Sequence, residues 1–213
     1  CLSRAQSLKR ASSKSEILAD FPHTTGIAPT GSSSSQEAFG RVLTEVSRNE
    51  AIRPYLVTTA PDVATSTNLG GFINRHGIFN KDVKREWNDN SIQKWVESPN
   101  GQHIELGISE MNLFTLLGQL GISGDISDQP LIPIGTVYDP FVLRGLDAFI
   151  YSVYSGAKFI VAGTPSGITL APEGGAHQST ITPSVGVELP GVVLMEPAYA
   201  QSLDWLLCDA LAH

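Results

Sequence analysis

The sequence predicts an α/β fold, in which a mainly parallel sheet is covered by helices on both faces. Two observations carry this prediction. Short apolar or β-branched runs alternate with helical patterns from Tyr55 onward, and this alternation is typical of parallel strands that are connected by helices. The chain has 213 residues, of which 41% are hydrophobic and 16% charged, a composition that suffices for a sizeable core.

The expected elements follow one another in a regular order. Strands are predicted at 55–59, 103–106, 131–134, 158–162 and 192–195, and helices at 37–48, 68–75, 109–120, 141–154 and 198–211. The helix at 109–120 has the strongest local signals, because Gly107 ends the strand before it and Ser109 can cap its first turn. Polar or glycine-rich connections are predicted at 80–102, 123–130 and 163–179.

The first 35 residues differ in composition from the rest of the chain. They are rich in serine and basic side chains and end in Gly31 and four serines, and such a tract buries little surface. We therefore predict an arm or linker over residues 1–35 and one folded domain over residues 36–213. The first residue is Cys1 and not Met, so we expect a fragment or a processed chain.

Charge and composition disfavour several classes of protein. The formal net charge of -7 disfavours a nucleic-acid-binding surface. The best candidate for a membrane span, residues 149–163, is interrupted by small polar residues and by Lys158, so no membrane insertion is expected. Cys1 and Cys208 form neither a disulfide framework nor a metal cluster, which is typical of a reducing, cytoplasmic compartment.

Polar or aromatic residues follow each of the first four predicted strands. They are Asp62, Glu110, Tyr138 with Phe141, and Glu173 with His177. Ligands of open parallel sheets bind beyond the carboxyl ends of the strands. We therefore expect these residues to gather at one edge of the sheet, although each can equally be an ordinary loop residue.

Each candidate residue has two explanations. Glu110 is either a carboxylate favoured by the dipole at a helix start or a buried acid kept for chemistry. Asp62 either caps the following helix or contacts a ligand. Tyr138 and Phe141 either belong to the core or form the wall of a site for a flat heterocycle. His177, in a loop with tandem glycines, either bonds a backbone carbonyl or donates to a substrate oxygen.

Several common site motifs are missing from the sequence. We find no dinucleotide-binding fingerprint, no phosphate loop ending in Gly-Lys-Ser/Thr and no His-Glu-x-x-His motif. Ser166 lies between small residues, but outside the strand-turn-helix pattern of a nucleophile elbow. A serine hydrolase and an unrelated nucleotide-binding domain are both disfavoured as a result.

Taken together, three stretches resemble the middle, pyrimidine-binding domain of thiamine-diphosphate enzymes of the transketolase and homodimeric pyruvate dehydrogenase type. Residues 57–70 resemble the first strand and turn of that domain, residues 105–110 its glutamate motif, and residues 170–178 its late Gly-His loop. The resemblance extends from Gln36 to the C-terminus in the family's order. The run is more similar to bacterial pyruvate dehydrogenases than to sugar transketolases.

The resemblance implies a role for each candidate residue. Glu110 is expected to hydrogen-bond the ring nitrogen of the aminopyrimidine, which favours the imino tautomer that accepts the thiazolium proton. Tyr138 and Phe141 are expected to stack near the pyrimidine, and Asp62 to lie near the thiazolium. His177 is expected to face the substrate. The cofactor supplies the electron sink, and the protein supplies orientation and electrostatics.

The resemblance also implies what the chain lacks. The family holds the diphosphate and its Mg²⁺ through a Gly-Asp-Gly motif in another domain, whereas Gly124-Asp125 is followed here by Ile126. We expect the chain to stop before the last strand of its domain, to hold no metal and to be inactive alone. Its strand ends are expected to face the diphosphate-binding domain of another subunit in a homodimer.

The implied function is that of a fragment of a 2-oxoacid dehydrogenase. The whole enzyme would decarboxylate pyruvate or a related acid and pass an acyl group to a lipoyl acyltransferase partner. Sugar ketol transfer is the alternative within the same family. A non-catalytic assembly module that keeps the fold is an alternative of another class.

Overall fold

A computed structural model describes residues 21–27, 31–82 and 95–213 of the chain. In these residues the centre of the molecule is a six-stranded sheet with the strand order β3-β2-β4-β1-β5-β6. All neighbouring strands pair in parallel. The strands are β1 (Leu56–Ala60), β2 (Ile78–Phe79), β3 (Glu97–Ser98), β4 (His103–Glu105), β5 (Ile132–Val137) and β6 (Ile160–Gly163).

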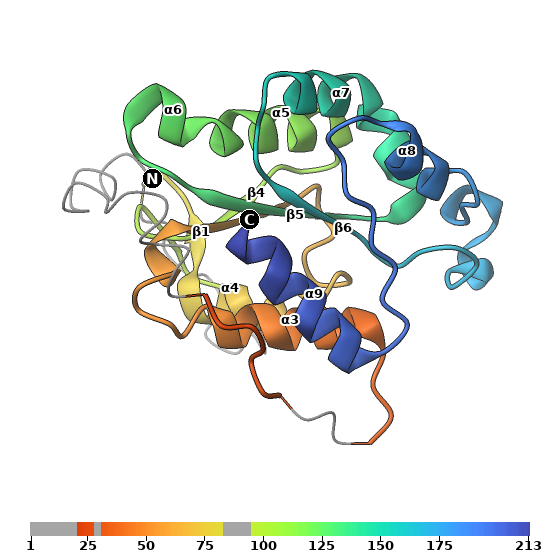
Figure 1. Cartoon of the computed structure of the whole chain (residues 1–213), viewed down its shortest axis with the longest axis horizontal. Helices are drawn as coiled ribbons and strands as arrows, with labels where there is room; N and C mark the ends of the chain where they lie inside the picture. The colour runs from red at the N-terminus through yellow and green to blue at the C-terminus, as the bar shows by residue number, and fades with distance from the viewer. Residues whose placement is uncertain (1–20, 28–30, 83–94) are drawn as a thin grey trace.

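Helices cover both faces of this sheet (Figure 1). On one face lie α5 (Glu110–Gly121), α6 (Ser123–Ser127) and α7 (Leu146–Tyr154), and on the other lie α3 (Ser35–Val46), α4 (Gly70–His76) and α9 (Ala200–Ala212). Shorter helices occupy the connections: α8 (Thr182–Glu188), η1 (Arg53–Tyr55), η2 (Asp139–Gly145), η3 (Ala171–Glu173) and η4 (Gly175–His177). The predicted fold class is confirmed. Within the described ranges, none of the helices has the length and apolar character needed to cross a membrane.

The register of the central strands brings their carboxyl ends to one edge. Thr59 of β1 lies opposite Ile104 of β4 and Gly135 of β5, and Val137 of β5 lies opposite Gly163 of β6. Because the strands are parallel, the loops that follow β1, β4, β5 and β6 all leave from the same edge. This edge is called the carboxyl edge below.

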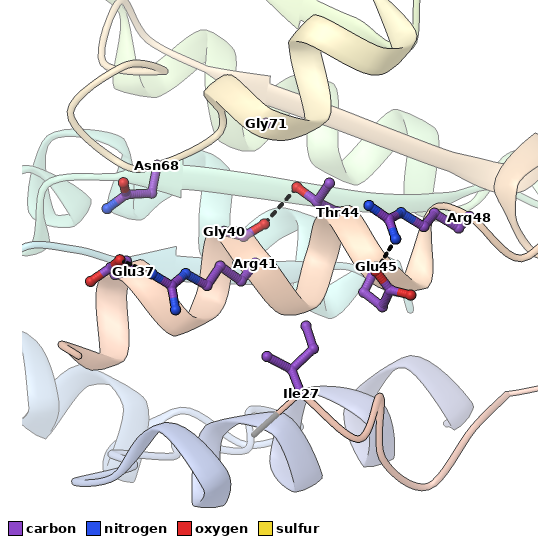
Figure 2. Close-up of a pocket in the computed structure, with 9 residues that line it drawn as sticks. All are labelled: Ile27, Glu37, Gly40, Arg41, Thr44, Glu45, Arg48, Asn68 and Gly71. Carbon is purple, nitrogen blue, oxygen red and sulfur yellow. Dashed lines mark hydrogen bonds and ion pairs between the residues drawn. The ribbon is translucent and has the colours of Figure 1, made fainter. Parts of the chain in front are cut away.

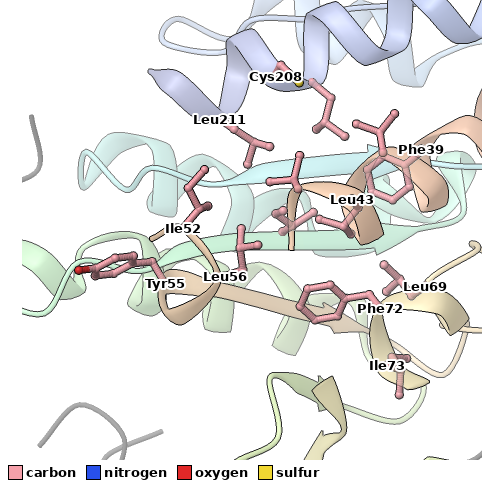
Figure 3. Packing of buried hydrophobic residues seen from close by; sticks show 14 of the residues in the cluster. Phe39, Leu43, Ile52, Tyr55, Leu56, Leu69, Phe72, Ile73, Cys208 and Leu211 are labelled. Carbon is pink, nitrogen blue, oxygen red and sulfur yellow. The ribbon is translucent and has the colours of Figure 1, made fainter. Parts of the chain in front are cut away.

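The larger apolar core lies under α3, α4 and α9 (Figure 3). Its centre is made by Leu43 of α3, Phe72 of α4 and Leu56 of β1, each at most 1% exposed. Leu211 of α9 packs into the same cluster. Side chains of this kind contribute about 1.5–3 kcal/mol each when they are fully buried, so this core carries much of the stability of the domain.

A second core lies on the opposite face, between the sheet, α5 and α7. Leu113, Phe114 and Leu117 of α5 are all 0% exposed, and Phe114 packs on Phe149 of α7 with ring centroids 5.0 Å apart. The spacing of these residues places them on one face of the helix. Ser109 is the N-cap, with its side chain accepting a hydrogen bond from the Asn112 amide. The predicted helix start is therefore confirmed.

Some expected elements differ from the structure. The strand predicted at 192–195 is wrong: these residues pair with no strand, and Val193 is 78% exposed. The segment follows Gly191, whose φ is 81°, and runs past α8, where Leu194 lies against Gly186. The helix predicted at 141–154 is split into η2 and α7 at Gly145, and α8 was not predicted.

The segment 21–27 is attached to α9, although it falls within the predicted arm. Phe21 is 7% exposed and belongs to the larger core. The Thr25 amide and hydroxyl donate to Asp204 Oδ1 at 3.0 and 2.6 Å, and the Thr24 hydroxyl donates to the same carboxylate. Burial opposes ionisation of Asp204, but the hydrogen bonds from Thr24 and Thr25 outweigh it and lower the pKa of this carboxyl. The domain boundary at residue 36 stays a prediction, and residues 1–20 lie outside the described ranges.

Candidate active site

Glu110 is the first residue of α5 and lies at the carboxyl edge, one short loop after β4. The residue is only 7% exposed. Its Oε1 lies 3.5 Å from Nη1 of Arg144, while its other carboxyl oxygen has no hydrogen-bond partner among the described residues. The helix start accounts for a negative charge here. A carboxylate that is largely buried and keeps one oxygen open for a ligand is also compatible with a functional acid.

Three predicted site residues from two different loops form an aromatic cluster at the same edge. Tyr138 and Phe141 follow β5, and His177 lies in η4 after β6. The ring centroids of Tyr138 and Phe141 are 6.0 Å apart, and the His177 ring lies 6.1 Å from Tyr138 and 5.2 Å from Phe141. These separations are favourable for aromatic pairs. The Tyr138 hydroxyl also donates to Ser66 Oγ at 2.8 Å, which ties the cluster to the loop after β1.

Arg144 joins the aromatic cluster to Glu110. Its guanidinium carbon lies 3.9 Å from the centroid of the Phe141 ring, in addition to the contact with the Glu110 carboxylate. Arg144 was not among the predicted site residues. The signal was available, because residues three apart in a helical turn share one face, and this spacing separates Arg144 from Phe141.

One ring nitrogen of His177 is buried and unpaired. Nε2 lies 3.5 Å from Glu173 Oε2, whereas the buried Nδ1 has no hydrogen-bond partner in the part of the chain that the structure describes. The explanation that a backbone carbonyl satisfies this side chain is therefore not supported. A buried polar atom without a partner is unfavourable in a native protein unless a ligand, an ion or water completes it.

Asp62 also lies at the carboxyl edge, but within the described ranges no hydrogen bond or ion pair joins it to the other predicted residues. Its backbone is in the left-handed region, with φ 62°, and its amide donates to Glu105 Oε1 at 2.8 Å. The side chain is exposed and forms no hydrogen bond or ion pair within the described residues. The capping explanation is wrong, because the N-cap of α4 is Leu69. The ligand explanation for Asp62 stays a prediction.

A buried histidine contacts Glu105, the residue whose carboxylate accepts a hydrogen bond from the Asp62 amide. His103 is 0% exposed, with Nδ1 2.9 Å from the Thr58 hydroxyl and Nε2 3.1 Å from Glu105 Oε2. Thr58 and His103 face one another in the register of β1 and β4. Glu105 therefore links a buried imidazole to the amide of Asp62. This pair was not predicted, although two polar residues in buried strands were a usable signal.

A groove of about 400 Å³ lies along α3, beside Ile27 and Gly71 (Figure 2). Its charged side chains already pair with one another on the surface of α3, in two acid-arginine pairs: Glu37 with Arg41 and Glu45 with Arg48. None of the predicted site residues lines it. The carboxyl edge is therefore the better candidate for chemistry.

Solved structures of transketolases contain a domain with the same fold. A transketolase variant from Pichia stipitis superposes with a TM-score of 0.68 at 16% sequence identity, covering 99% of this chain and 28% of that chain. The transketolase of Campylobacter jejuni gives a TM-score of 0.60 at 14% identity, covering 84% of this chain and 25% of that chain. The chain thus has the α/β fold of one domain of transketolase-like enzymes.

The family follows from the sequence. The family model for the pyruvate dehydrogenase E1 component middle domain matches residues 18–213. The chain belongs to this family, the pyrimidine-binding middle domain of thiamine-diphosphate-dependent enzymes of the transketolase and pyruvate dehydrogenase type. The predicted resemblance is confirmed.

Curated relatives are similar at low identity and are much longer. The pyruvate dehydrogenase E1 component of Pseudomonas aeruginosa is 22% identical over 174 residues, covering 80% of this chain and 20% of the relative. That of Mycobacterium tuberculosis is 27% identical over 177 residues, covering 81% and 19%. A 6-deoxy-6-sulfo-D-fructose transketolase subunit from a Clostridium species is 26% identical over 125 residues, covering 58% and 37%. The chain spans about a fifth of the pyruvate dehydrogenase relatives.

Proposed function

We propose that this chain supplies the pyrimidine-binding half of the active site of a thiamine-diphosphate-dependent 2-oxoacid dehydrogenase. The observation that carries the proposal is the nearly buried Glu110 carboxylate at the carboxyl edge of the sheet, of which one oxygen has no partner among the residues that the structure describes. Membership in the pyruvate dehydrogenase family supports it. In this proposal the whole enzyme decarboxylates pyruvate or a related 2-oxoacid and passes the acyl group to a lipoyl acyltransferase partner.

The residues at the edge fit a flat, nitrogen-containing ring. Glu110 offers a carboxyl oxygen for a ring nitrogen, Phe141 offers an aromatic ring, and Nδ1 of His177, which has no partner within the described ranges, offers a polar contact. In the proposal Tyr138 lines the same ring and Asp62 lies nearer the thiazolium. Thiamine diphosphate, when bound, supplies the electron sink for decarboxylation.

Glu110 has the main chemical role in the proposal. Its carboxyl group holds the hydrogen bond to the aminopyrimidine nitrogen and so controls the proton at that atom. Because the group is largely removed from water, this hydrogen bond is stronger and better oriented than it would be in solvent. His177 would donate to an oxygen of the substrate, and Glu173, 3.5 Å from its Nε2, would orient its ring.

The diphosphate and its Mg²⁺ are assigned in this proposal to another domain. Across the described residues, no group of three or more His, Cys, Asp or Glu side chains could hold a metal ion, and the sequence has no Gly-Asp-Gly motif. We assign them to the diphosphate-binding domain of the second subunit of a homodimer. This chain alone is accordingly expected to be inactive.

Sugar ketol transfer is the second candidate reaction. It is favoured by the Clostridium relative, whose name describes a sulfofructose transketolase subunit. Assays of the whole enzyme separate the two reactions. Reductive acylation of a lipoyl domain with pyruvate supports the dehydrogenase, whereas transfer from a ketose donor to an aldehyde acceptor supports the transketolase.

The test compares two glutamates in similar helix starts. Glu110→Gln removes the candidate acid, and Glu37→Gln is the matched control, because Glu37 also lies in the first turn of a serine-capped helix and pairs with an arginine. In the enzyme that contains this segment, Glu110→Gln is expected to retain thiamine diphosphate binding by isothermal titration. Its turnover should fall by roughly 10²–10⁴, while Glu37→Gln should change neither quantity.

Two results would contradict this assignment. Near-normal turnover of Glu110→Gln would show that Glu110 only satisfies the helix start. If the unsubstituted enzyme binds no thiamine diphosphate, the proposed chemistry fails as a whole and the non-catalytic assembly module becomes the better explanation.

A further inference from the structure

Asp139 is a buried acid at the carboxyl edge that the proposed chemistry does not use. It follows Tyr138, begins η2 and is only 6% exposed. Its neighbours in space come from the connection between β6 and α8, which also carries His177. Burying a carboxyl group is unfavourable unless hydrogen bonds replace the water that it loses. The hydrogen bonds of Asp139 therefore indicate its structural role.

The first set of contacts is with the beginning of that connection. The Asp139 amide donates to the Pro165 carbonyl oxygen at 3.3 Å, and the Gly167 amide donates to Asp139 Oδ2 at 3.4 Å. The Cα of Asp139 also lies close to Gly163, where an added Cβ would approach it to 3.6 Å. One residue of η2 therefore holds the chain as it leaves β6.

The second set of contacts is with the first residue of α8, where the connection ends. The Thr182 hydroxyl donates to the Asp139 carbonyl oxygen at 3.0 Å and lies 2.8 Å from the Ser179 hydroxyl. Both hydroxyls also favour the ionised carboxylate of Asp139. Asp139 thus contacts both Gly167 and Thr182, which are fifteen positions apart in the sequence.

Between these two points the chain forms a closed loop. The Ser179 amide donates to the Gly167 carbonyl oxygen at 3.1 Å, so the loop ends meet at a narrow neck, as in compact surface loops. The loop, residues 167–179, contains η3 and η4 and therefore Glu173 and His177. Asp139 lies against the neck, while His177 reaches back to the Phe141 ring.

We infer that Asp139 is a positioning residue, which fastens the neck of the 167–179 loop to the carboxyl edge and so holds His177 against Phe141. The chemical role of His177 rests on the proposed function, but the fastening does not. The electrostatics agree with a largely desolvated anchor. The pKa of Asp139 is raised overall, mainly because the carboxyl group is buried. The hydrogen bonds from Gly167 and Thr182 lower the pKa, and the charge of Glu196 raises it.

The test measures how fast His177 is modified, without any cofactor. The 213-residue chain and its variants are treated with diethyl pyrocarbonate, and each histidine is followed by peptide mass spectrometry. Two histidines serve as internal references: His213, whose side chain is 77% exposed, and His103, whose side chain is 0% exposed. His177 lies between them, with its side chain 28% exposed.

Asp139→Ala is expected to raise the modification rate of His177 by roughly three- to tenfold, the scale set by losing one buried hydrogen bond. The rates of His103 and His213 should not change. Asp139→Asn keeps an amide oxygen for the Gly167 amide and should restore a rate near that of the unsubstituted chain. Thr182→Val, which removes only the second anchor point, should give a smaller rise and serves as the test if Asp139→Ala does not fold.

The inference is overturned if a folded Asp139→Ala chain modifies His177 at the original rate. It is also overturned if His103 accelerates together with His177, since that result indicates general loosening, or if Asp139→Asn behaves like Asp139→Ala. Because no cofactor enters the assay, failure of thiamine diphosphate binding in the whole enzyme would leave its result unaffected.

Discussion

A methyl group at Gly145 would collide with the start of α5. An added Cβ would lie 2.4 Å from Cδ2 of Phe114 and 2.7 Å from the carbonyl oxygen of Glu110, both inside van der Waals contact. Phe114 is 0% exposed and the carbonyl belongs to the helix backbone, so neither can yield easily. The backbone of Gly145, with φ -112°, is open to alanine, and therefore Gly145→Ala tests packing alone.

The expected cost follows from overpacking a close helix contact. Inserted methyl groups in packed cores cost about 1–3 kcal/mol, and with a urea dependence of about 2 kcal/mol per molar the unfolding midpoint should fall by roughly 0.5–1.5 M. Gly70→Ala is the matched control. Gly70 begins α4 and an added Cβ there meets nothing within 4 Å, so alanine should be neutral or stabilise by up to about 1 kcal/mol.

Urea unfolding followed by circular dichroism measures both variants. If Gly145→Ala and Gly70→Ala unfold at the same urea concentration, α7 does not pack on α5 as closely as described. The displacement in Gly145→Ala would fall on Glu110 and Arg144, since both adjoin the contact. The same substitution in the whole enzyme should therefore reduce turnover by more than its loss of stability explains.

Two further substitutions test the N-terminal segment and the cap of α5. The pKa of Asp204 is lowered in the fold, so its stabilising contribution is complete above the unfolded value of roughly 3.9 and is lost as the pH falls through the lower folded value. Asp204→Asn should thus unfold at lower urea than the unsubstituted chain at pH 7, with a difference that shrinks toward about pH 3; a constant difference contradicts the hydrogen bonds to Thr24 and Thr25. Ser109→Ala removes the cap and should cost about 0.5–2 kcal/mol in the same assay, and an unchanged midpoint would show that the cap contributes nothing.

The helix that carries Glu110 could be predicted because its signals are local. Ser109 supplies a cap, and Leu113, Phe114 and Leu117 define an apolar face within three turns. The structure has the helix from Glu110 to Gly121, one residue from the prediction at each end. Nothing distant in the chain is needed to specify it.

The strand predicted at 192–195 failed because a strand also needs a neighbour. Its apolar residues have high strand propensity, but propensity is overridden by tertiary packing. Val192 packs on the second core and Leu194 on α8 at Gly186. Val192 is partly buried in this way without a strand partner, and the sequence could not indicate which surface it would contact.

The candidate site was predictable only in part for a related reason. The parallel order of the strands brings Glu110, Tyr138, Phe141 and His177 to one edge, and that order could be read from the alternation of elements. The contacts of Arg144 with Glu110 and of Asp139 with Gly167 join residues 34 and 28 positions apart. They depend on the reach of particular side chains between loops, which no local pattern encodes.

The sheet divides the hydrophobic interior into two compartments, and only one of them adjoins Glu110 and Arg144. The compartment beneath α3, α4 and α9 is the larger and lies on the opposite side of the strands (Figure 1). Substitutions of residues such as Leu43 and Phe72 are therefore expected to change the free energy of unfolding without altering direct contacts of the cluster that adjoins the acid. The domain thus holds most of its stabilising core in one layer and the surroundings of Glu110 in the other.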